Sequence, residues 1–363
     1  MYKLSKNEYD KLLNDSITSN YKKVNNNIDK VINKNGKELT KKLKVADRMM
    51  RNGNNNCFIT LKDHKDNFQN NPKVRLINPA KNEVGRISKV ILEKINKKLR
   101  QHTNVNQWND TKQVIDWFLE IPEKRKHKFL VFDVKDFYPS ISKKIFIEAL
   151  NFAEQLININ NEDLKIMFHS RKSLLFNNEQ AWMKKGNELF DVTMGAYDGV
   201  EVCELVGIFM LHKICLSYDK KNIGLYRDDG LAVFQNVSGP ESEKIKKHFQ
   251  RIFSEQGLDI IIECNKKIVD YLDVTLNLTN GTFKPYHKPD TTIQYIHKES
   301  NHPPNIIKQI PNMIEKRLSD HSSNEYLFYE ATPPYEKALK KSGFNVKLKY
   351  SPSQNKSSQN KNN

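Results

Sequence analysis

The chain has 363 residues, and its 60 Lys and Arg against 43 Asp and Glu give a formal net charge of +17. Aromatic residues reach 10%, which excludes a wholly disordered chain, because disorder goes with few aromatic residues. The central apolar run at 205–211 is far shorter than the ~20 residues that cross a bilayer. We expect about two domains and a polyanionic partner, with nucleic acid as the first candidate and an anionic membrane surface as the second.

The two ends of the chain differ in composition from its middle. Residues 1–50 are rich in Lys and Asn with short helical patches, and this predicts a basic, weakly packed helical extension. The last residues, 346–363, offer little to bury and are typical of a disordered tail. The four cysteines are scattered without a C-x-x-C pair, which favours no disulfide framework, no zinc site and a reducing compartment.

The first strong element is a buried strand at 129–132 that ends at Asp133. Pro139 then ends the strand, and Ser142 is a good cap for a helix whose apolar positions begin at Ile145. A second helix fits 202–216 and is apolar on most sides, so we expect it at the centre of the fold.

A hairpin follows, with β-prone runs on both sides of a turn at 227–230. The next helix has Ser238 as its candidate cap and stops at Gly257, and a strand at 258–262 comes after it. A further hairpin is predicted with strands at 269–278 and 282–286, because Asn280-Gly281 separates them. This order is close to a split βαβ arrangement, an α+β fold with an antiparallel sheet backed by helices.

Three carboxylates fall at one edge of the predicted sheet. Asp133 ends the first strand, and Asp228 and Asp229 lie at the tip of the hairpin. If the strands are neighbours, the carboxylates converge and repel one another unless a cation neutralises them. Hard oxygen ligands favour Mg²⁺. Two such ions roughly 3.5–4 Å apart would activate an attacking oxygen and stabilise a leaving oxygen, as phosphoryl transfer requires.

These residues carry a resemblance to a known family. Phe-Asp-Val-Lys-Asp-Phe-Tyr-Pro-Ser-Ile at 132–141 resembles the first catalytic motif of reverse transcriptases, and Tyr-Arg-Asp-Asp at 226–229 resembles their Tyr-x-Asp-Asp box. The resemblance implies that Asp133, Asp228 and Asp229 are catalytic and bind two Mg²⁺ ions, for which Mn²⁺ can substitute. It also implies the fingers, palm and thumb of a right-hand polymerase.

Further motifs resemble the reverse transcriptases of Penelope-like elements. They are Leu-Lys-Asp-His-Lys at 61–65, Val-Arg-Leu-Ile-Asn at 74–78, Tyr-Leu-Asp-Val at 271–274 and the stretch 286–303. The endonuclease motifs that often accompany this type are not found. The implied domains are a helical extension (1–50), fingers (51–128), a palm (129–282, with a finger-like insertion at 157–192), a thumb or connection (283–345) and the tail (346–363).

The resemblance assigns the substrate groups as well. Arg75, together with Lys62 or Lys65, would bind the triphosphate of an incoming dNTP, since Arg offers a fork and Lys a point charge to phosphate oxygens. Tyr138 holds the position of a sugar gate that crowds a ribose 2′-OH, which favours deoxynucleotides. Gly195, within Thr-Met-Gly-Ala-Tyr-Asp-Gly at 193–199, would position the template or dNTP, although this stretch departs from the family pattern.

Four residues follow the last palm strand. Lys266 or Lys267 is a candidate proton donor to the leaving pyrophosphate, against the alternative of a surface lysine. Leu272 and Asp273 match the primer-gripping hairpin, where we expect Asp273 to order the turn or to pair with a basic neighbour. Beyond them, a basic helical stretch at 306–317 suits a thumb that contacts duplex phosphates through Lys308, Lys316 and Arg317.

The leading interpretation is an RNA-directed DNA polymerase that extends a primer 3′-OH with dNTPs, with an RNA template and a DNA primer as partners. An RNA-templated RNA polymerase is the first alternative, and Tyr138 speaks against it. The second is a basic nucleic-acid-binding protein, derived from such an enzyme but inactive. We expect an intracellular protein and no membrane partner; nucleus and cytoplasm both remain open.

Overall fold

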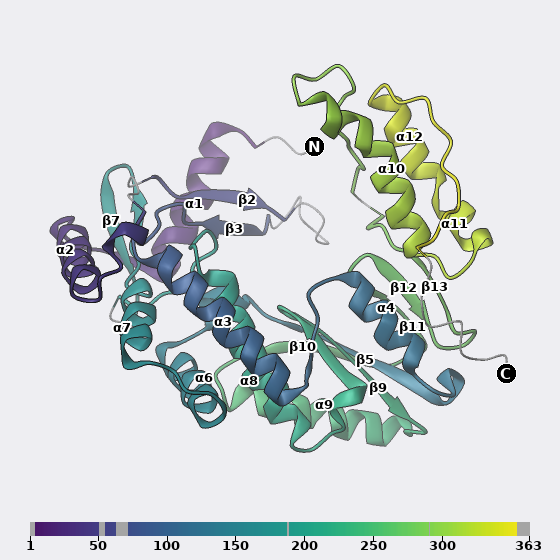
Figure 1. The fold of residues 1–363 in the computed structure, drawn as a ribbon, viewed down its shortest axis with the longest axis horizontal. Coiled ribbons are helices and arrows are strands. Elements are labelled where there is room, and N and C mark those ends of the chain that lie inside the picture. The colour runs from purple at the N-terminus through teal and green to yellow at the C-terminus, as the bar shows by residue number, and fades with distance from the viewer. Residues whose placement is uncertain (1–3, 51–54, 63–71, 187–188, 290, 354–363) are drawn as a thin grey trace. The chain divides into compact units, whose positions relative to one another are not determined.

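The computed structural model describes residues 4–50, 55–62, 72–186, 189–289 and 291–353. The chain forms two compact units, which Figure 1 traces in chain order from purple to yellow. The first unit comprises Met1–Gln107, Phe132–Gly230 and Lys244–Ile262. The second comprises Trp108–Val131, Leu231–Glu243 and Glu263–Asn363.

Helices and strands are interspersed along most of the chain. Up to residue 126 they are α1 (Lys6–Asn20), β1 (Tyr21–Lys23), α2 (Asn27–Lys42), η1 (Ala46–Arg48), β2 (Phe58–Leu61), β3 (Val74–Ile77), α3 (Gly85–Thr103), β4 (Asn106–Gln107), α4 (Thr111–Glu120) and η2 (Lys124–Lys126). The middle holds β5 (His127–Val134), α5 (Phe137–Ser140), α6 (Lys143–Leu156), α7 (Asn161–Ser170), β6 (Leu175–Asn177), β7 (Gln180–Lys184), α8 (Gly199–Cys215), η3 (Lys220–Asn222), β8 (Ile223–Tyr226) and β9 (Asp229–Gln235). The remainder is α9 (Gly239–Ser254), β10 (Ile260–Lys266), β11 (Ile268–Tyr271), β12 (Val274–Asn277), β13 (Thr282–Pro285), α10 (Pro304–Asp320), α11 (Glu325–Ala331) and α12 (Pro333–Lys341).

The five-stranded sheet has the predicted split βαβ arrangement. Its strand order is β10-β5-β9-β8-β4. The β8–β9 hairpin therefore lies on one side of β5, and β10, which comes last in the chain, lies on the other side. β8 and β9 form a hairpin because only Arg227 and Asp228 separate them. The short strand β4 adds a parallel edge beside β8, which the sequence did not predict.

The predicted helices around this sheet are confirmed. α6 begins after Ser142, whose hydroxyl accepts the backbone N–H of Ile145 at 3.3 Å. α9 begins after Ser238, which exchanges hydrogen bonds with Glu241 in a capping box. α8 is buried on most of its sides, as its apolar sequence indicates.

Polar contacts fix α8 against α3, which lies beside it in Figure 1. The Asn96 side-chain amide donates to the carbonyl of Glu201 at 2.8 Å, and Arg100 pairs with Glu204 at 3.2 Å. Because α8 carries the loop 193–199 at its start, these contacts give that loop a rigid support.

The expectation of a weakly packed N-terminal extension is wrong for the described residues. Ile17 is fully buried, and it shares a core with Leu13, Tyr21 and Trp182. β1 pairs antiparallel with β7, with Tyr21 opposite Lys184. The i, i+4 spacing of Leu13 and Ile17 places a narrow apolar stripe on one face of α1, and the abundance of Lys and Asn in the composition conceals it.

The second unit contains the antiparallel sheet β11-β12-β13 and the helices α10 to α12. The hairpin at Asn280-Gly281 is confirmed, since β12 and β13 pair across it. The single strand predicted at 269–278 is two strands, because the chain turns at Leu272, whose φ is +52°. No Gly or Asn marks that turn, and this is why the sequence does not reveal it.

Residues 346–353 are packed beyond the point where the sequence analysis places the start of a disordered tail. Leu348 is buried in a core with Leu318, Phe328 and Leu339. The backbone N–H of Ser353 donates to the Asp320 carboxylate at 2.7 Å. Residues 354–363 lie outside the described part of the chain.

Candidate active site

The two acidic motifs meet on neighbouring strands of the five-stranded sheet. β5 and β9 are adjacent in the sheet, with Asp133 near the end of β5 and Asp229 at the start of β9. The backbone N–H of Val134 donates to the carbonyl of Asp228 at 3.0 Å. Asp133, Asp228 and Asp229 are all half-buried. Residues that are nearly 100 positions apart in the chain are therefore neighbours in the backbone, as the sequence predicts.

The close approach of the two strands depends on Gly230. A Cβ atom at this position would lie 2.0 to 2.3 Å from three ring atoms of Phe132, the residue that precedes Asp133. The ring itself is fully enclosed and contacts Phe249 and Phe253, with centroids 5.6 and 5.5 Å away. Gly230 thus allows the aromatic ring to lie against the β9 backbone directly beside the acidic residues.

The donors in this region are the oxygen ligands that Mg²⁺ prefers. Within the described residues, however, no three Asp, Glu, His or Cys side chains are grouped closely enough to hold a metal ion. The donor type and the backbone positions of Asp133 and Asp228 therefore suit a magnesium site, whereas the three carboxylates are not gathered around one point. The two-ion site remains a prediction.

Tyr138 lies in the short helix α5 that follows Asp133. Asp136, just before this helix, has a left-handed backbone with φ of 43°, which turns the chain sharply away from the strand. The Tyr138 ring lies against Gly199 at the start of α8, where a Cβ would meet the ring at 3.4 Å. Burial raises the pKa of Tyr138, and Cys203 and Asp228 act in the same direction. The phenol is therefore neutral and close to the acidic turn.

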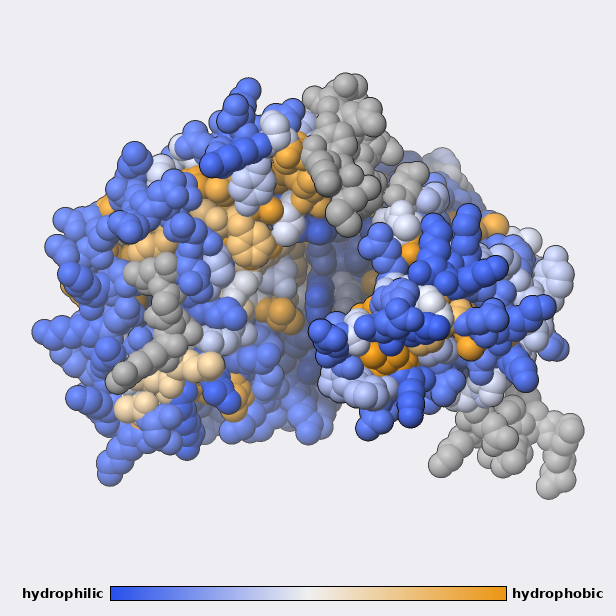
Figure 2. Space-filling model, turned by 90° about the horizontal axis from the view of Figure 1, so that it is seen from above, coloured by the Kyte–Doolittle hydropathy of each residue, from blue (hydrophilic) through white to orange (hydrophobic). Residues whose placement is uncertain are grey.

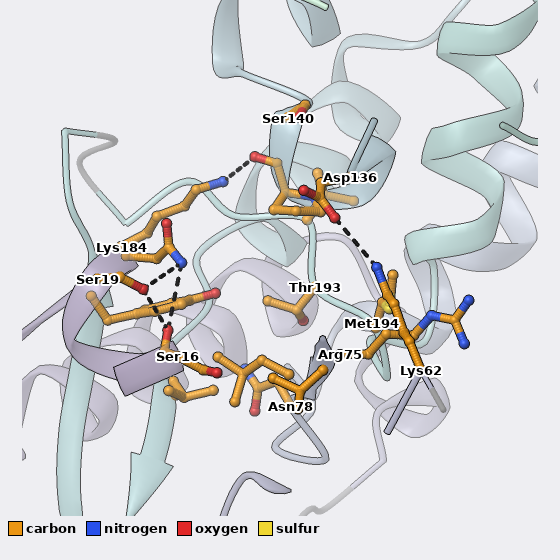
Figure 3. Close-up of a pocket in the computed structure, with 17 residues that line it drawn as sticks. Ser16, Ser19, Lys62, Arg75, Asn78, Asp136, Ser140, Lys184, Thr193 and Met194 are labelled. Atoms are coloured by element: carbon orange, nitrogen blue, oxygen red, sulfur yellow. Dashed lines mark hydrogen bonds and ion pairs between the residues drawn. The ribbon is translucent and has the colours of Figure 1, made fainter. Parts of the chain in front are cut away.

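The predicted triphosphate cations line a cavity of about 440 Å³ in the same unit. Lys62 follows β2, and Arg75 lies on β3 opposite Thr60. Figure 3 shows the Lys62 ammonium directed at the Asp136 carboxylate, 3.6 Å away. Lys65, the other candidate, lies outside the described residues. The pairing of Lys62 with Asp136 links the segment after β2 to the segment that follows Asp133.

Gly195 joins the cavity to the loop before α8. Its φ is +110°, and a Cβ there would lie 2.3 Å from the carbonyl oxygen of Asn78. The backbone N–H of Asn78 donates to the carbonyl of Met194 at 2.9 Å. Only glycine fits this position, so the predicted close backbone approach is with the end of β3. A contact of Gly195 with a nucleotide remains a prediction.

A buried ion pair beneath this loop was not anticipated. Arg171 and Asp198 are both about 1% exposed and paired, and the Ser170 hydroxyl donates to the same carboxylate at 2.8 Å. Burial lowers the pKa of Arg171 to about 10, with Asp191 opposing the shift. Through these contacts Asp198 anchors the loop 193–199, the stretch that precedes α8. Nothing in the local sequence pairs residues 171 and 198.

The lysines predicted to act as a proton donor belong to the second unit. Lys267 donates to the carbonyls of Arg125 and His127 at 2.6 and 2.7 Å, so its ammonium group is held by the backbone. Lys266 forms a half-exposed ion pair with Glu263 at 2.9 Å. Of the two, Lys266 is the one whose ammonium group is not fixed by two carbonyl groups.

The predicted primer-gripping residues form the turn between β11 and β12. Asp273 pairs with Arg317 of α10 at 3.0 Å, which confirms the expectation of a basic neighbour. Its backbone carbonyl also accepts the N–H of Tyr286 at 2.8 Å. Lys308 and Lys316 are exposed on α10, so the three cations predicted to contact phosphates differ in their surroundings.

Hydrophilic residues cover most of the face seen in Figure 2, as the high charge of the chain leads one to expect. Among the described residues, none of the helices has both the length and the apolar character required to cross a membrane.

Comparisons with known proteins establish the fold. No family model matches the chain, and no curated protein matches it. The chain is similar to apo telomerase from Candida tropicalis, with a TM-score of 0.53, 11% identity, and coverage of 92% of this chain and 63% of that one. It is similar to the RNA-dependent RNA polymerase of a human picobirnavirus, with a TM-score of 0.53, 13% identity, and coverage of 79% and 57%.

The chain spans less than two thirds of the length of either of these proteins. At such identities the likeness concerns the fold alone. The predicted fold is confirmed: the protein has the α+β architecture of the right-hand polymerases, with antiparallel sheets and helices.

Proposed function

We propose that this protein is an RNA-directed DNA polymerase, a reverse transcriptase of the Penelope-like type. The observation that carries the proposal is the 3.0 Å hydrogen bond from Val134 to Asp228, which holds the two acidic motifs side by side within a right-hand polymerase fold. The basic excess of the chain supports a nucleic-acid substrate.

In the proposed reaction the primer 3′-oxygen bonds to the α-phosphorus of a dNTP, and the bond to pyrophosphate breaks. Asp133, Asp228 and Asp229 are the residues that would hold Mg²⁺, which when bound lowers the pKa of the attacking hydroxyl and stabilises charge on the leaving oxygen. The hydrogen bond between Val134 and Asp228 keeps the backbone of the two motifs in place, so it is the carboxylate side chains that would turn toward Mg²⁺ on binding.

The fingers residues would receive the triphosphate. Arg75 offers a two-pronged contact to phosphate oxygens, and Lys62 supplies a point charge once it exchanges its partner Asp136 for the substrate. Tyr138, fixed against Gly199, would occupy the space beside the sugar and exclude a 2′-hydroxyl. Lys266 is the remaining candidate for protonating pyrophosphate.

An RNA-templated RNA polymerase is the second candidate. The similarity to the picobirnavirus RNA-dependent RNA polymerase has the same TM-score as the similarity to telomerase, 0.53, and this supports it. Tyr138 argues against it, since an RNA polymerase needs room and a hydrogen-bond partner for the 2′-hydroxyl.

Primer extension with the purified chain on an RNA template, in Mg²⁺ and in Mn²⁺, tests these functions. We expect incorporation of dNTPs and strong discrimination against NTPs. Preferential incorporation of NTPs would favour the RNA polymerase. Salt-sensitive RNA binding without incorporation of either nucleotide would overturn the proposal and point to an inactive nucleic-acid-binding protein.

A further inference from the structure

A chain of polar contacts, buried at Tyr21 and Asp191 and open to solvent at Pro139, connects the N-terminal strand to the helix that carries Tyr138. The Lys184 ammonium on β7 lies 3.2 Å from the Asp191 carboxylate and donates to the carbonyl of Pro139 at 2.5 Å, the bond drawn in Figure 3. The Tyr21 hydroxyl donates to the other oxygen of Asp191 at 2.8 Å. Four residues from four segments of the first unit thus form one connected network.

The low exposure of the Lys184–Asp191 ion pair makes its geometry specific. The side chains of Lys184 and Asp191 are 12% and 2% exposed. Burial raises the pKa of Tyr21, and the neighbouring Asp191 adds to the effect, so its hydroxyl stays protonated and donates. A charge in such surroundings is costly unless it is paired, so Lys184 is confined to the position where both its partners lie.

The contact with Pro139 acts on a helix of only four residues. Within α5 the carbonyls of Phe137 and Tyr138 already accept the N–H of Ile141, at 3.2 and 3.3 Å. Lys184 takes the next carbonyl, that of Pro139, and so fixes the end of the helix. The ring of Tyr138, one residue before Pro139, packs against Gly199 at the start of α8. A helix this short has little stability of its own.

We propose that Lys184 is a positioning residue that sets the Tyr138 ring, and that through this ring it determines the sugar specificity of the active site. This inference rests on the proposed function for its effect on nucleotides. Its structural part, the hold of Lys184 on α5, does not depend on any activity. The N-terminal strand takes part because Tyr21 fixes Asp191, the counter-ion of Lys184.

Two variants and a matched control test the structural part. Lys184→Met removes the ammonium group and keeps the length, whereas Lys184→Arg keeps a cation that can reach both partners. Lys185→Met is the control, because Lys185 also donates to backbone carbonyls, those of Thr18 and Ser19, but not to α5. We expect the amide of Ile141 to exchange hydrogen on the order of tenfold faster in Lys184→Met, and near the parent rate in the other two. Equal exchange in all four proteins would overturn the proposal.

The functional part is a comparison of kcat/KM for a dNTP and for the matching NTP. We expect Lys184→Met to lower this ratio on the order of tenfold, since small displacements of positioning groups have effects of this size. In a Tyr138→Ala background, Lys184→Met should change the ratio no further, because its effect acts through the ring. Effects of the two changes that multiply would refute the inference while leaving the polymerase intact.

The hold of Lys184 on α5 and the polymerase activity can fail independently. Absence of any incorporation by the parent protein contradicts the proposed function, and the exchange rate of the Ile141 amide still decides whether Lys184 fixes α5. If Lys184→Met does not fold, Tyr21→Phe replaces it, because it removes one hydroxyl from the same network. Faster exchange of Ile141 in Tyr21→Phe supports the proposal, and the parent rate refutes it.

Discussion

Replacement of Gly230 by alanine is expected to destabilise the first unit through a single steric conflict. The added Cβ would lie 2.0, 2.2 and 2.3 Å from three atoms of the Phe132 ring. Carbon atoms in contact are normally about 3.5 to 4.0 Å apart, so the ring or the strand must move by about 1.5 Å. The ring cannot move freely, because it is fully buried and contacts Phe249 and Phe253.

Overpacking of a filled core costs about 1 to 3 kcal/mol, and we expect Gly230→Ala to reach the upper end of that range. For a unit of about 150 to 250 residues, about 3 kcal/mol corresponds to a loss of about 6 to 12 °C in Tm. Thermal unfolding followed by circular dichroism measures it. Because the moved ring precedes Asp133 and the new methyl group follows Asp229, primer extension should fall in the same variant.

The matched control is Gly239→Ala, since a Cβ at the start of α9 has no heavy atom within 4 Å. This change should leave Tm unchanged or raise it slightly. A smaller ring partner, in the double variant Phe132→Leu with Gly230→Ala, should recover part of the loss. A Tm for Gly230→Ala within about 1 °C of the parent would refute the steric reasoning and, with it, the close packing of β5 on β9.

Three further predictions concern the proposed sugar gate, the pH dependence of stability and the basic residues of α10. Tyr138→Ala should raise the kcat/KM for NTPs relative to dNTPs, measured by single-nucleotide incorporation, and an unchanged ratio would remove the sugar-gate role. Burial, and then Lys172, lowers the pKa of His169 from 6.5 to about 4, so between these pH values the unfolded chain binds more protons, and the free energy of unfolding should fall as pH drops through this window. Denaturant titrations at pH 7 and pH 5 should show this loss in the parent and less of it in His169→Gln. Lys316→Gln should lower the salt dependence of duplex binding by about one counter-ion, whereas Arg317→Gln should lower it less because Arg317 already pairs with Asp273; equal effects would contradict this distinction.

The sequence predicts those parts of the structure that have a local physical signature. Ser142 has a hydroxyl that satisfies a helix N–H, and the apolar run of α8 requires burial on all sides, so both helices could be predicted. The turn at Arg227 and Asp228 is marked by residues that favour turns. The relation of Asp133 to Asp228 then follows from the strand order.

The remaining features depend on contacts between distant residues. Nothing near Arg171 indicates Asp198, and nothing near Lys184 indicates Pro139 or Asp191. Gly230 reads as a turn residue in the sequence, although the ring of Phe132 is what excludes a side chain there. The hairpin at Leu272 has no local signal because a non-glycine residue with a large apolar side chain adopts a left-handed backbone there. Such features arise from packing, which a local pattern does not record.

The pair formed by Asp133, near the end of β5, and Asp228, in the turn before β9, is the centre of the proposed mechanism, and Asp228→Asn tests it most directly. Primer extension with dNTPs on an RNA template should be lost in this variant, with a Tm equal to that of the parent. Asp10→Asn, an exposed carboxylate on α1, should retain full activity. Extension by Asp228→Asn at the parent rate would show that nucleotide transfer does not take place at these carboxylates.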